Sequence, residues 1–171
     1  MDERHENEQY FFDVGTLAHL RRFVAGYESP CCVCAPSLGR ALAEAGVPVR
    51  VLDIDERFSS VPGFRRWDLS RPEYLDEAFD LILCDPPFFN VSLSRLFAAL
   101  RTLSRNDFRQ KLLVSYLCRR ADALTGTFAQ FGLEATGYRP GHETVEPVER
   151  NAIEFFGNLD AEETRRLRGE I

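Results

Sequence analysis

The sequence predicts an α/β fold, a doubly wound and mostly parallel sheet of about seven strands with helices on both faces. Compact β-prone runs alternate with segments of helical periodicity over residues 31–132. The run FDLILCD, residues 79–85, is continuously apolar, which is typical of a central parallel strand covered on both faces. Two successive β-prone runs near the carboxyl end predict a late antiparallel hairpin at one edge.

The amino-terminal third predicts helix, strand, helix, strand. Apolar residues recur at helical spacing after Thr16, which we expect to be the N-cap of a first helix. Strands are expected at 31–35 and 49–54. The segment 38–46 between them predicts a helix, with Gly46 at a C-cap position.

The middle of the chain continues the alternation. Residues 64–69 predict a short third strand, and Pro72 predicts a helical turn because its missing N–H costs nothing at a helix start. After the apolar strand, leucine and phenylalanine at i, i+3, i+4 and i+7 predict a helix over 92–104. A strand over 110–118 and a helix over 119–132 follow.

The carboxyl end predicts two strands and a last helix. The strands are expected at 133–140 and 151–159. Asp160 and Glu163 have the spacing of a capping box, which predicts a helix over 161–168.

Composition limits the class of protein. A chain of 171 residues with 44% hydrophobic content can form one domain with a sizeable core, which we expect over residues 9–171 after a flexible start at 1–8. The net charge of −6 argues against a module that binds nucleic acid mainly by neutralising phosphates. The charged start and the absence of a long apolar run favour a cytoplasmic protein that neither is secreted nor spans a membrane.

Cysteine and histidine residues do not predict a metal site. The odd number of cysteines, each within an apolar run, indicates reduced core thiols rather than disulfides. Cys31, Cys32 and Cys34 have no partner pair at zinc spacing. The three histidines are isolated in sequence, and we expect them on the surface: His5, His19 and His142.

In a doubly wound sheet, ligands bind beyond the carboxyl ends of the strands, near the point where strand order reverses. The first strand is followed by small residues that would let a ligand approach the backbone, although the same residues also suit a simple strand-to-helix turn. The candidate contacts in this loop are Ala35, Pro36, Ser37 and Gly39.

Three aspartates follow the next two strands. Asp53 and Asp55 stand at i and i+2, so they point to the same side, where a carboxylate can accept two hydrogen bonds from a ribose diol. The alternative for each is a solvated cap of the next turn. Asp68, at the end of the third strand, can accept from an adenine amino group or be an ordinary turn residue.

The central strand ends in Asp85-Pro86-Pro87-Phe88, which makes a more specific prediction. An amino group conjugated to a ring is a poor nucleophile until hydrogen bonds pull it toward tetrahedral geometry. The Asp85 carboxylate and the Pro86 carbonyl offer two acceptors, and both prolines stiffen the loop through their fixed φ. Phe88 and Phe89 offer flat faces for stacking a base. The alternative is a strand-to-helix turn with Asp85 as a cap.

D-P-P-F after an apolar strand resembles the catalytic motif [DNS]-P-P-[YFW] of S-adenosylmethionine-dependent amino methyltransferases. From Gln9 to about Leu159, the chain is similar to the N6-adenine methyltransferase-like family. That family includes enzymes that methylate a lysine of elongation factor 1A and a zinc-finger relative that methylates an adenine of ribosomal RNA. The matching segments are QYFF, CAPSLG, LDIDERF, WDLS, LILCDPPFFN and the pair Asn151 and Asn158.

The resemblance implies a class I methyltransferase fold, Rossmann-like and seven-stranded, that binds S-adenosyl-L-methionine. It places the methionine end of the cofactor at 35–39, its ribose at Asp55 and Asp53, and its adenine at Asp68. Asp85, Pro86, Pro87 and Phe88 would be catalytic. The chain departs from the family in beginning its last strand with Asn151-Ala152-Ile153 instead of N-E-F, and in lacking zinc-finger modules.

The sequence leaves two classes of methyl acceptor open. An adenine amino group of RNA or DNA suits the paired acceptors and the stacking ring. A protein lysine must first lose a proton, which costs about 4.6 kcal/mol at pH 7 from a free pKa near 10.4, and burial among Tyr10, Phe88 and Phe89 would have to offset that. We favour adenine, with lysine second. A methyltransferase-like binding module without catalysis ranks third, because the D-P-P-F site is complete.

Overall fold

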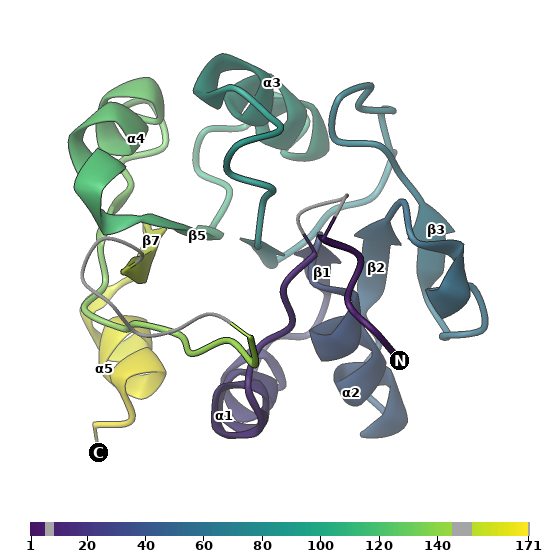
Figure 1. Cartoon of the computed structure of the whole chain (residues 1–171). Coiled ribbons are helices and arrows are strands. Elements are labelled where there is room, and N and C mark those ends of the chain that lie inside the picture. The colour runs from purple at the N-terminus through teal and green to yellow at the C-terminus, as the bar shows by residue number, and fades with distance from the viewer. Residues whose placement is uncertain (6–8, 145–151, 171) are drawn as a thin grey trace.

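The computed structural model describes residues 1–5, 9–144 and 152–170. Within them, strands form one sheet in the order β3-β2-β1-β4-β5-β7-β6 (Figure 1). The strands are β1 (Pro30–Val33), β2 (Arg50–Asp53), β3 (Phe64–Arg66), β4 (Leu81–Cys84), β5 (Leu112–Leu117), β6 (Glu134–Ala135) and β7 (Ile153–Gly157). The helices are α1 (Val14–Val24), α2 (Pro36–Glu44), α3 (Leu93–Leu103), α4 (Ala121–Thr127) and α5 (Ala161–Arg168), with short 3₁₀ turns η2 (Glu56–Phe58) and η3 (Cys118–Arg120).

The topology confirms the predicted doubly wound sheet. Strands β1 to β5 pair in parallel, and β7 runs antiparallel to both β5 and β6. The chain runs outward from β1 through β2 to β3, then returns to place β4 on the other side of β1. The order therefore reverses between β1 and β4, and the loops after these strands lie at the ligand-binding edge.

Helices cover both faces of the sheet, with α1, α2 and α5 on one face and α3 and α4 on the other (Figure 1). The continuous apolar run of β4 follows from this arrangement. Leu81 and Leu83 pack with the first group of helices, whereas Ile82 and Cys84 pack with the second. All four side chains are fully buried. Successive residues of a strand face opposite sides, so a strand between two covered faces must be apolar throughout.

Two predicted local features are wrong. Helix α1 is capped by Asp13, whose side chain accepts from the Thr16 N–H at 2.8 Å, and not by Thr16. Pro72 does not start a helical turn, and residues 72–79 form no helix. The Glu73 carbonyl, which a helix there would use internally, instead accepts from the Trp67 indole N–H at 3.0 Å.

Other element boundaries differ by a few residues from the predictions. The helix expected over 119–132 is α4, which ends at Thr127, and the strand expected over 133–140 is only β6. The capping box is confirmed, because Asp160 accepts from the Glu163 N–H and Glu163 accepts from the Asp160 N–H. Asn151 lies outside the described residues.

Across the part of the chain that the structure describes, no helix has both the length and the apolar character needed to cross a membrane.

Candidate active site

Two cavities meet at the edge where β1 and β4 end. The larger, of about 390 Å³, is lined by side chains from the amino-terminal segment and from the loops after β1, β4 and β5. The smaller, of about 160 Å³, extends toward β2 and β3. Both cavities are lined by Gln9, Cys34 and Asp85, so these residues stand where the two meet.

The loop after β1 forms the floor of the larger cavity. Ala35, Pro36 and Ser37 line it, and Pro36 and Ser37 begin α2, as expected for a ligand that approaches a helix start. Cys34 has a φ of 58°, in the left-handed region that favours glycine. Gly39, predicted as a cofactor contact, is not among the lining residues. It lets α2 approach β2, since a Cβ there would lie 2.5 Å from a Val51 methyl.

Asp85 directly follows β4 and points into both cavities. Its backbone N–H donates to the Val33 carbonyl at 3.0 Å, which ties the loop to β1. Its Oδ1 accepts from the Ser115 hydroxyl at 2.5 Å, and its Oδ2 lies 4.0 Å from Nε2 of His142. Burial raises the pKa of Asp85, although His142 and the Ser115 hydroxyl act in the opposite direction.

The remaining residues of the D-P-P-F motif shape the walls. Pro86 and Phe88 line the larger cavity, whereas Pro87 lines the smaller one. Phe88 packs edge-to-face on the buried Tyr116, with ring centroids 5.4 Å apart. Phe89 is 71% exposed at the rim.

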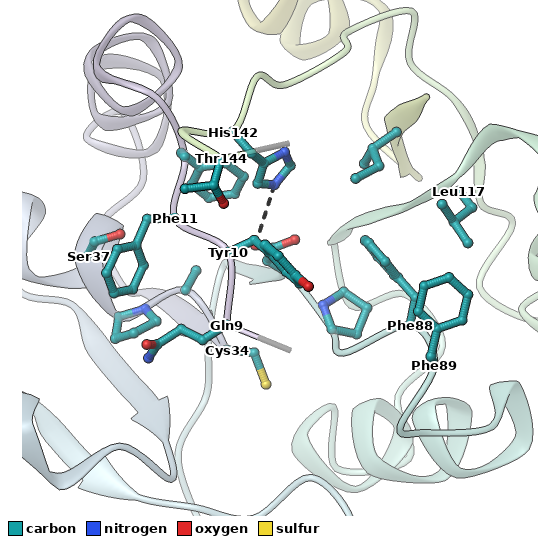
Figure 2. Close-up of a pocket in the computed structure, with 16 residues that line it drawn as sticks. Gln9, Tyr10, Phe11, Cys34, Ser37, Phe88, Phe89, Leu117, His142 and Thr144 are labelled. Atoms are coloured by element: carbon teal, nitrogen blue, oxygen red, sulfur yellow. Dashed lines mark ion pairs between the residues drawn. The ribbon is translucent and has the colours of Figure 1, made fainter. Parts of the chain in front are cut away.

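Aromatic side chains surround Asp85 on several sides. Figure 2 shows Tyr10 crossing the middle of the larger cavity, with Phe88 and Phe89 on the side away from Phe11 and Ser37. The cavity therefore offers flat apolar faces around one carboxylate, a suitable environment for a planar ring that carries an amino group.

The aspartates after β2 have different environments. Asp53 is 8% exposed, lines the smaller cavity and accepts from the Asp55 N–H at 2.8 Å. Burial raises its pKa to about 6. Asp55 lines neither cavity, because Arg57 and Gln9 donate to its carboxylate. The Arg57 guanidinium is the main cause that lowers the pKa of Asp55 to about 2.

Asp68 also lines the smaller cavity, together with Trp67, Leu69 and Ile54. Its Oδ1 accepts from the Ser70 N–H at 2.9 Å, as in an ordinary turn, while the residue stays partly exposed. The structure thus brings Asp53, Asp68 and Asp85 to one connected space and leaves Asp55 outside it.

Sequence reasoning missed three residues of this site. His142 was expected on the surface, but its side chain is only 4% exposed and it faces Asp85. Gln9 bridges Asp55 and Arg57, with its amide oxygen 3.0 Å from the Arg57 guanidinium. Of the three, only Ser115 could have been found from the sequence, because a serine inside the apolar run LLVSYL of β5 needs a hydrogen-bond partner when it is buried. Among the described residues no group of histidine, cysteine and acidic side chains could hold a metal ion.

Comparison with known families decides the classification. Residues 3–160 match the family model described as probable N6-adenine methyltransferase. The chain belongs to this family. The match confirms the resemblance drawn from the sequence motifs. No curated protein sequence matches the chain significantly.

Solved structures confirm the class I methyltransferase fold. Magnesium protoporphyrin IX methyltransferase from Synechocystis PCC 6803, with bound S-adenosylmethionine, is 16% identical with a TM-score of 0.56, over 84% of this chain and 77% of that chain. A TehB-like methyltransferase from Corynebacterium glutamicum is 15% identical with a TM-score of 0.54, over 85% and 87%. The N-methyltransferase NodS from Bradyrhizobium japonicum is 15% identical with a TM-score of 0.51, over 85% and 95%.

The family and the fold imply S-adenosylmethionine as the methyl donor, and the cavities fit it. The smaller cavity is lined by two carboxylates, those of Asp53 and Asp68, which can accept hydrogen bonds from hydroxyl or amino groups. The larger one has the start of α2 for the charged methionine end and opens onto Asp85. Cys34 and Asp85 line both cavities, so one molecule can extend from one cavity into the other past these residues.

The opposite pKa shifts of the two β2 aspartates make a stability prediction. Above pH 6, Asp53 carries a charge that burial disfavours, so Asp53→Asn should raise the free energy of unfolding by roughly 2–3 kcal/mol at pH 8. The gain should shrink as the pH falls from about 6 toward 4 and disappear below about pH 3, where this carboxyl is protonated in both the folded and the unfolded chain. Urea unfolding at several pH values measures it.

Asp55→Asn is the matched variant and should have the opposite sign. Its ionised carboxylate is stabilised by Arg57, so the substitution should cost roughly 1–3 kcal/mol at pH 8. That cost should decline as the pH falls from about 4 to about 2. Equal effects of the two substitutions at pH 8 would contradict the assignment.

Proposed function

We propose that this protein is an S-adenosylmethionine-dependent N-methyltransferase whose acceptor is the N6 amino group of adenine in RNA or DNA. One observation carries the proposal. The Asp85 carboxylate, held by Ser115 at the end of β4, stands where the smaller cavity meets the larger, aromatic one. An acceptor group and a donor can meet there.

The chemistry of the acceptor supports adenine. The lone pair of an adenine amino group is delocalised into the ring, and hydrogen bonds to two acceptors favour the tetrahedral nitrogen that attacks a methyl group. Asp85 offers its carboxylate and Pro86 its carbonyl, both on a loop stiffened by proline. Phe88 and Phe89 would stack the base after it leaves its strand, and Tyr10 would close the other side.

The cofactor would lie across both cavities. We assign its methionine end to Ala35, Pro36 and Ser37, and its adenine to Asp68. For the ribose we favour Asp53 over Asp55, because the Asp53 carboxylate faces the cavity while that of Asp55 is held by Arg57 and Gln9.

A protein lysine is the second candidate, and one observation favours it. The chain has a net charge of −6, which suits a cationic protein substrate better than a nucleic acid. Against this candidate stands the free energy of removing a proton from the lysine before attack, which is about 4.6 kcal/mol at pH 7. A nearby ionised Asp85 increases that cost, because it stabilises the ammonium form.

The proposal is tested by binding and by labelling. Calorimetry should detect S-adenosylmethionine binding to the folded protein. Transfer of labelled methyl into fractionated RNA, DNA and protein, followed by mass spectrometry of the hydrolysed products, should yield N6-methyladenine. Label found only as methyllysine would transfer the assignment to the second candidate, and no cofactor binding would refute both.

Asp85→Ala should lose at least about 100-fold in kcat/KM for methyl transfer, since the acceptor nitrogen loses its main hydrogen-bond partner. The Kd for S-adenosylmethionine should stay within about threefold, which is ~0.65 kcal/mol. Asp107→Ala, which changes an exposed aspartate paired with Arg109, is the control and should keep normal turnover. Near-normal turnover of Asp85→Ala would contradict its role.

Phe89→Ala should raise the KM for a nucleic-acid acceptor about 5- to 150-fold, because a base–aromatic stack contributes about 1–3 kcal/mol. Stability should change by less than about 0.5 kcal/mol, because Phe89 is largely exposed. Tyr74→Ala removes another exposed aromatic side chain, one that lines neither cavity, and should leave KM unchanged. Equal KM values for the two variants would argue against stacking on Phe89.

A further inference from the structure

His142 is held over the active site by contacts between two segments far apart in sequence. Residues 11–13 and 141–143 pair antiparallel: the Asp13 N–H donates to the Gly141 carbonyl at 2.9 Å, and the Glu143 N–H donates to the Phe11 carbonyl at 3.0 Å. The His142 ring packs against Phe12, with centroids 5.2 Å apart. These contacts fix the direction in which the imidazole points.

The imidazole lies on the Oδ2 side of the Asp85 carboxylate, and the dashed line at His142 in Figure 2 marks this ion pair. Ser115 donates to Oδ1 of Asp85, which leaves Oδ2 to face the cavity. Nε2 of His142 lies 4.0 Å from Oδ2, and the two side chains are 4% and 12% exposed. The distance is longer than a hydrogen bond, and a small movement of either side chain would close one.

We infer that His142 is a positioning residue that takes up the proton which Asp85 receives from the methylated nitrogen. The inference rests on the proposed N-methyl transfer. It assigns a path for the proton, which the D-P-P-F motif alone does not supply.

The proton balance of the reaction requires such a path. The amino nitrogen uses its lone pair to form the bond to the methyl carbon, and the carbon–sulfur bond breaks with its electron pair returning to sulfur. The nitrogen then carries a positive charge until one N–H proton leaves. Oδ2 of Asp85 accepts that proton, and the unprotonated form of His142 accepts it from Asp85 at Nε2, which restores the carboxylate. The imidazolium then gives its proton to solvent water before the next turnover.

The other titratable groups around the pair are less suited to this role. Asp53 faces Asp85 from the β2 side, and its carboxylate accepts the Asp55 N–H. The hydrogen bond to Cys84, together with burial, raises the pKa of the Cys34 thiol well above its usual range. The thiol therefore keeps its proton and does not accept another.

On the side of His142, three more titratable groups are close. Glu3 accepts from the Phe11 N–H and from Thr144, and Asp13 caps α1. Tyr10 lines the cavity with a phenol, which does not accept a proton at neutral pH. Within the described part of the chain, the His142 imidazole is the basic side chain that faces Oδ2 of Asp85.

Two variants test the inference, with the acceptor that the labelling experiment identifies. His142→Gln keeps a polar side chain that cannot take a proton, and should lower kcat about 100-fold or more with the Kd for S-adenosylmethionine within about threefold. His142→Ala should show the same loss. Added imidazole should raise the kcat of this variant at least tenfold, and more basic imidazoles should raise it further. His19→Ala removes a histidine that lines neither cavity, so imidazole should not change its kcat.

A kcat of His142→Gln within threefold of the unsubstituted protein would overturn the inference. So would rescue of His142→Ala that ignores the basicity of the added imidazole, because a packing role alone would give that result.

A measurement without turnover keeps the inference separate from the proposed function. Carbon NMR of the Asp85 carboxyl should show its titration moving to higher pH in His142→Gln, because the favourable charge interaction with the imidazole is lost. An unchanged titration would overturn the pairing, even if the unsubstituted protein transfers methyl. If the protein transfers no methyl to any acceptor, the proposed function fails while this titration still decides whether the pair is coupled.

Discussion

The parallel pairing of β1 with β4 is the constraint on which the active site depends. Val33 is the register partner of Cys84, so both strands end at the same level of the sheet. The residues that follow, Cys34 and Asp85, are thereby placed side by side, and the Asp85 N–H donates back to Val33. Strand order reverses at this pair, so neither crossover connection covers the edge, and the cavities open there.

Placing carboxylates at this edge of the sheet lowers the free energy of unfolding, and the residues around each carboxylate determine by how much. Asp53 and Asp85 are both buried, their charges repel each other, and burial raises the pKa of each. Asp55 is two residues from Asp53, yet Arg57 and Gln9 stabilise its ionised form. The buried carboxylates that face the cavities are therefore the least compensated ones. Sites that bind ligands commonly retain such destabilised groups, because pairing them internally would remove them from the ligand.

The fold was predictable because its signals are local. The continuous apolar run of β4 follows from two covered faces, and the alternation of strands and helices predicts the parallel order. Pro72 shows the limit of such reasoning. Its segment would start a helix in isolation, but the Trp67 indole binds the Glu73 carbonyl and holds the chain in another path. A side-chain hydrogen bond between residues six apart outweighs the preference of proline for a helix start there.

The cavity lining was predictable where its residues end a strand or directly follow one, as for Asp53 and Asp85. It was not predictable where a contact joins distant segments. His142 lies 57 residues from Asp85 in sequence and approaches it only because residues 11–13 pair with 141–143. Gln9 reaches Asp55 across 46 residues. The sequence shows neither contact. From the sequence alone, Asp55 is therefore as good a candidate for a ribose contact as Asp53, and His142 is one isolated histidine.

Under the proposed N-methyl transfer, the pair formed by Asp85 and His142 would serve either acceptor, but at a different moment of the reaction. An adenine amino group is neutral when it binds, so its extra proton leaves after the methyl group arrives. A lysine is charged when it binds, so its proton must leave first, while an ionised Asp85 opposes that loss. A carboxylate that faces the acceptor, with a base behind it, therefore suits proton removal after transfer better than before it. The flat aromatic walls formed by Tyr10 and Phe88 favour the same order, because they fit a ring rather than an alkyl chain.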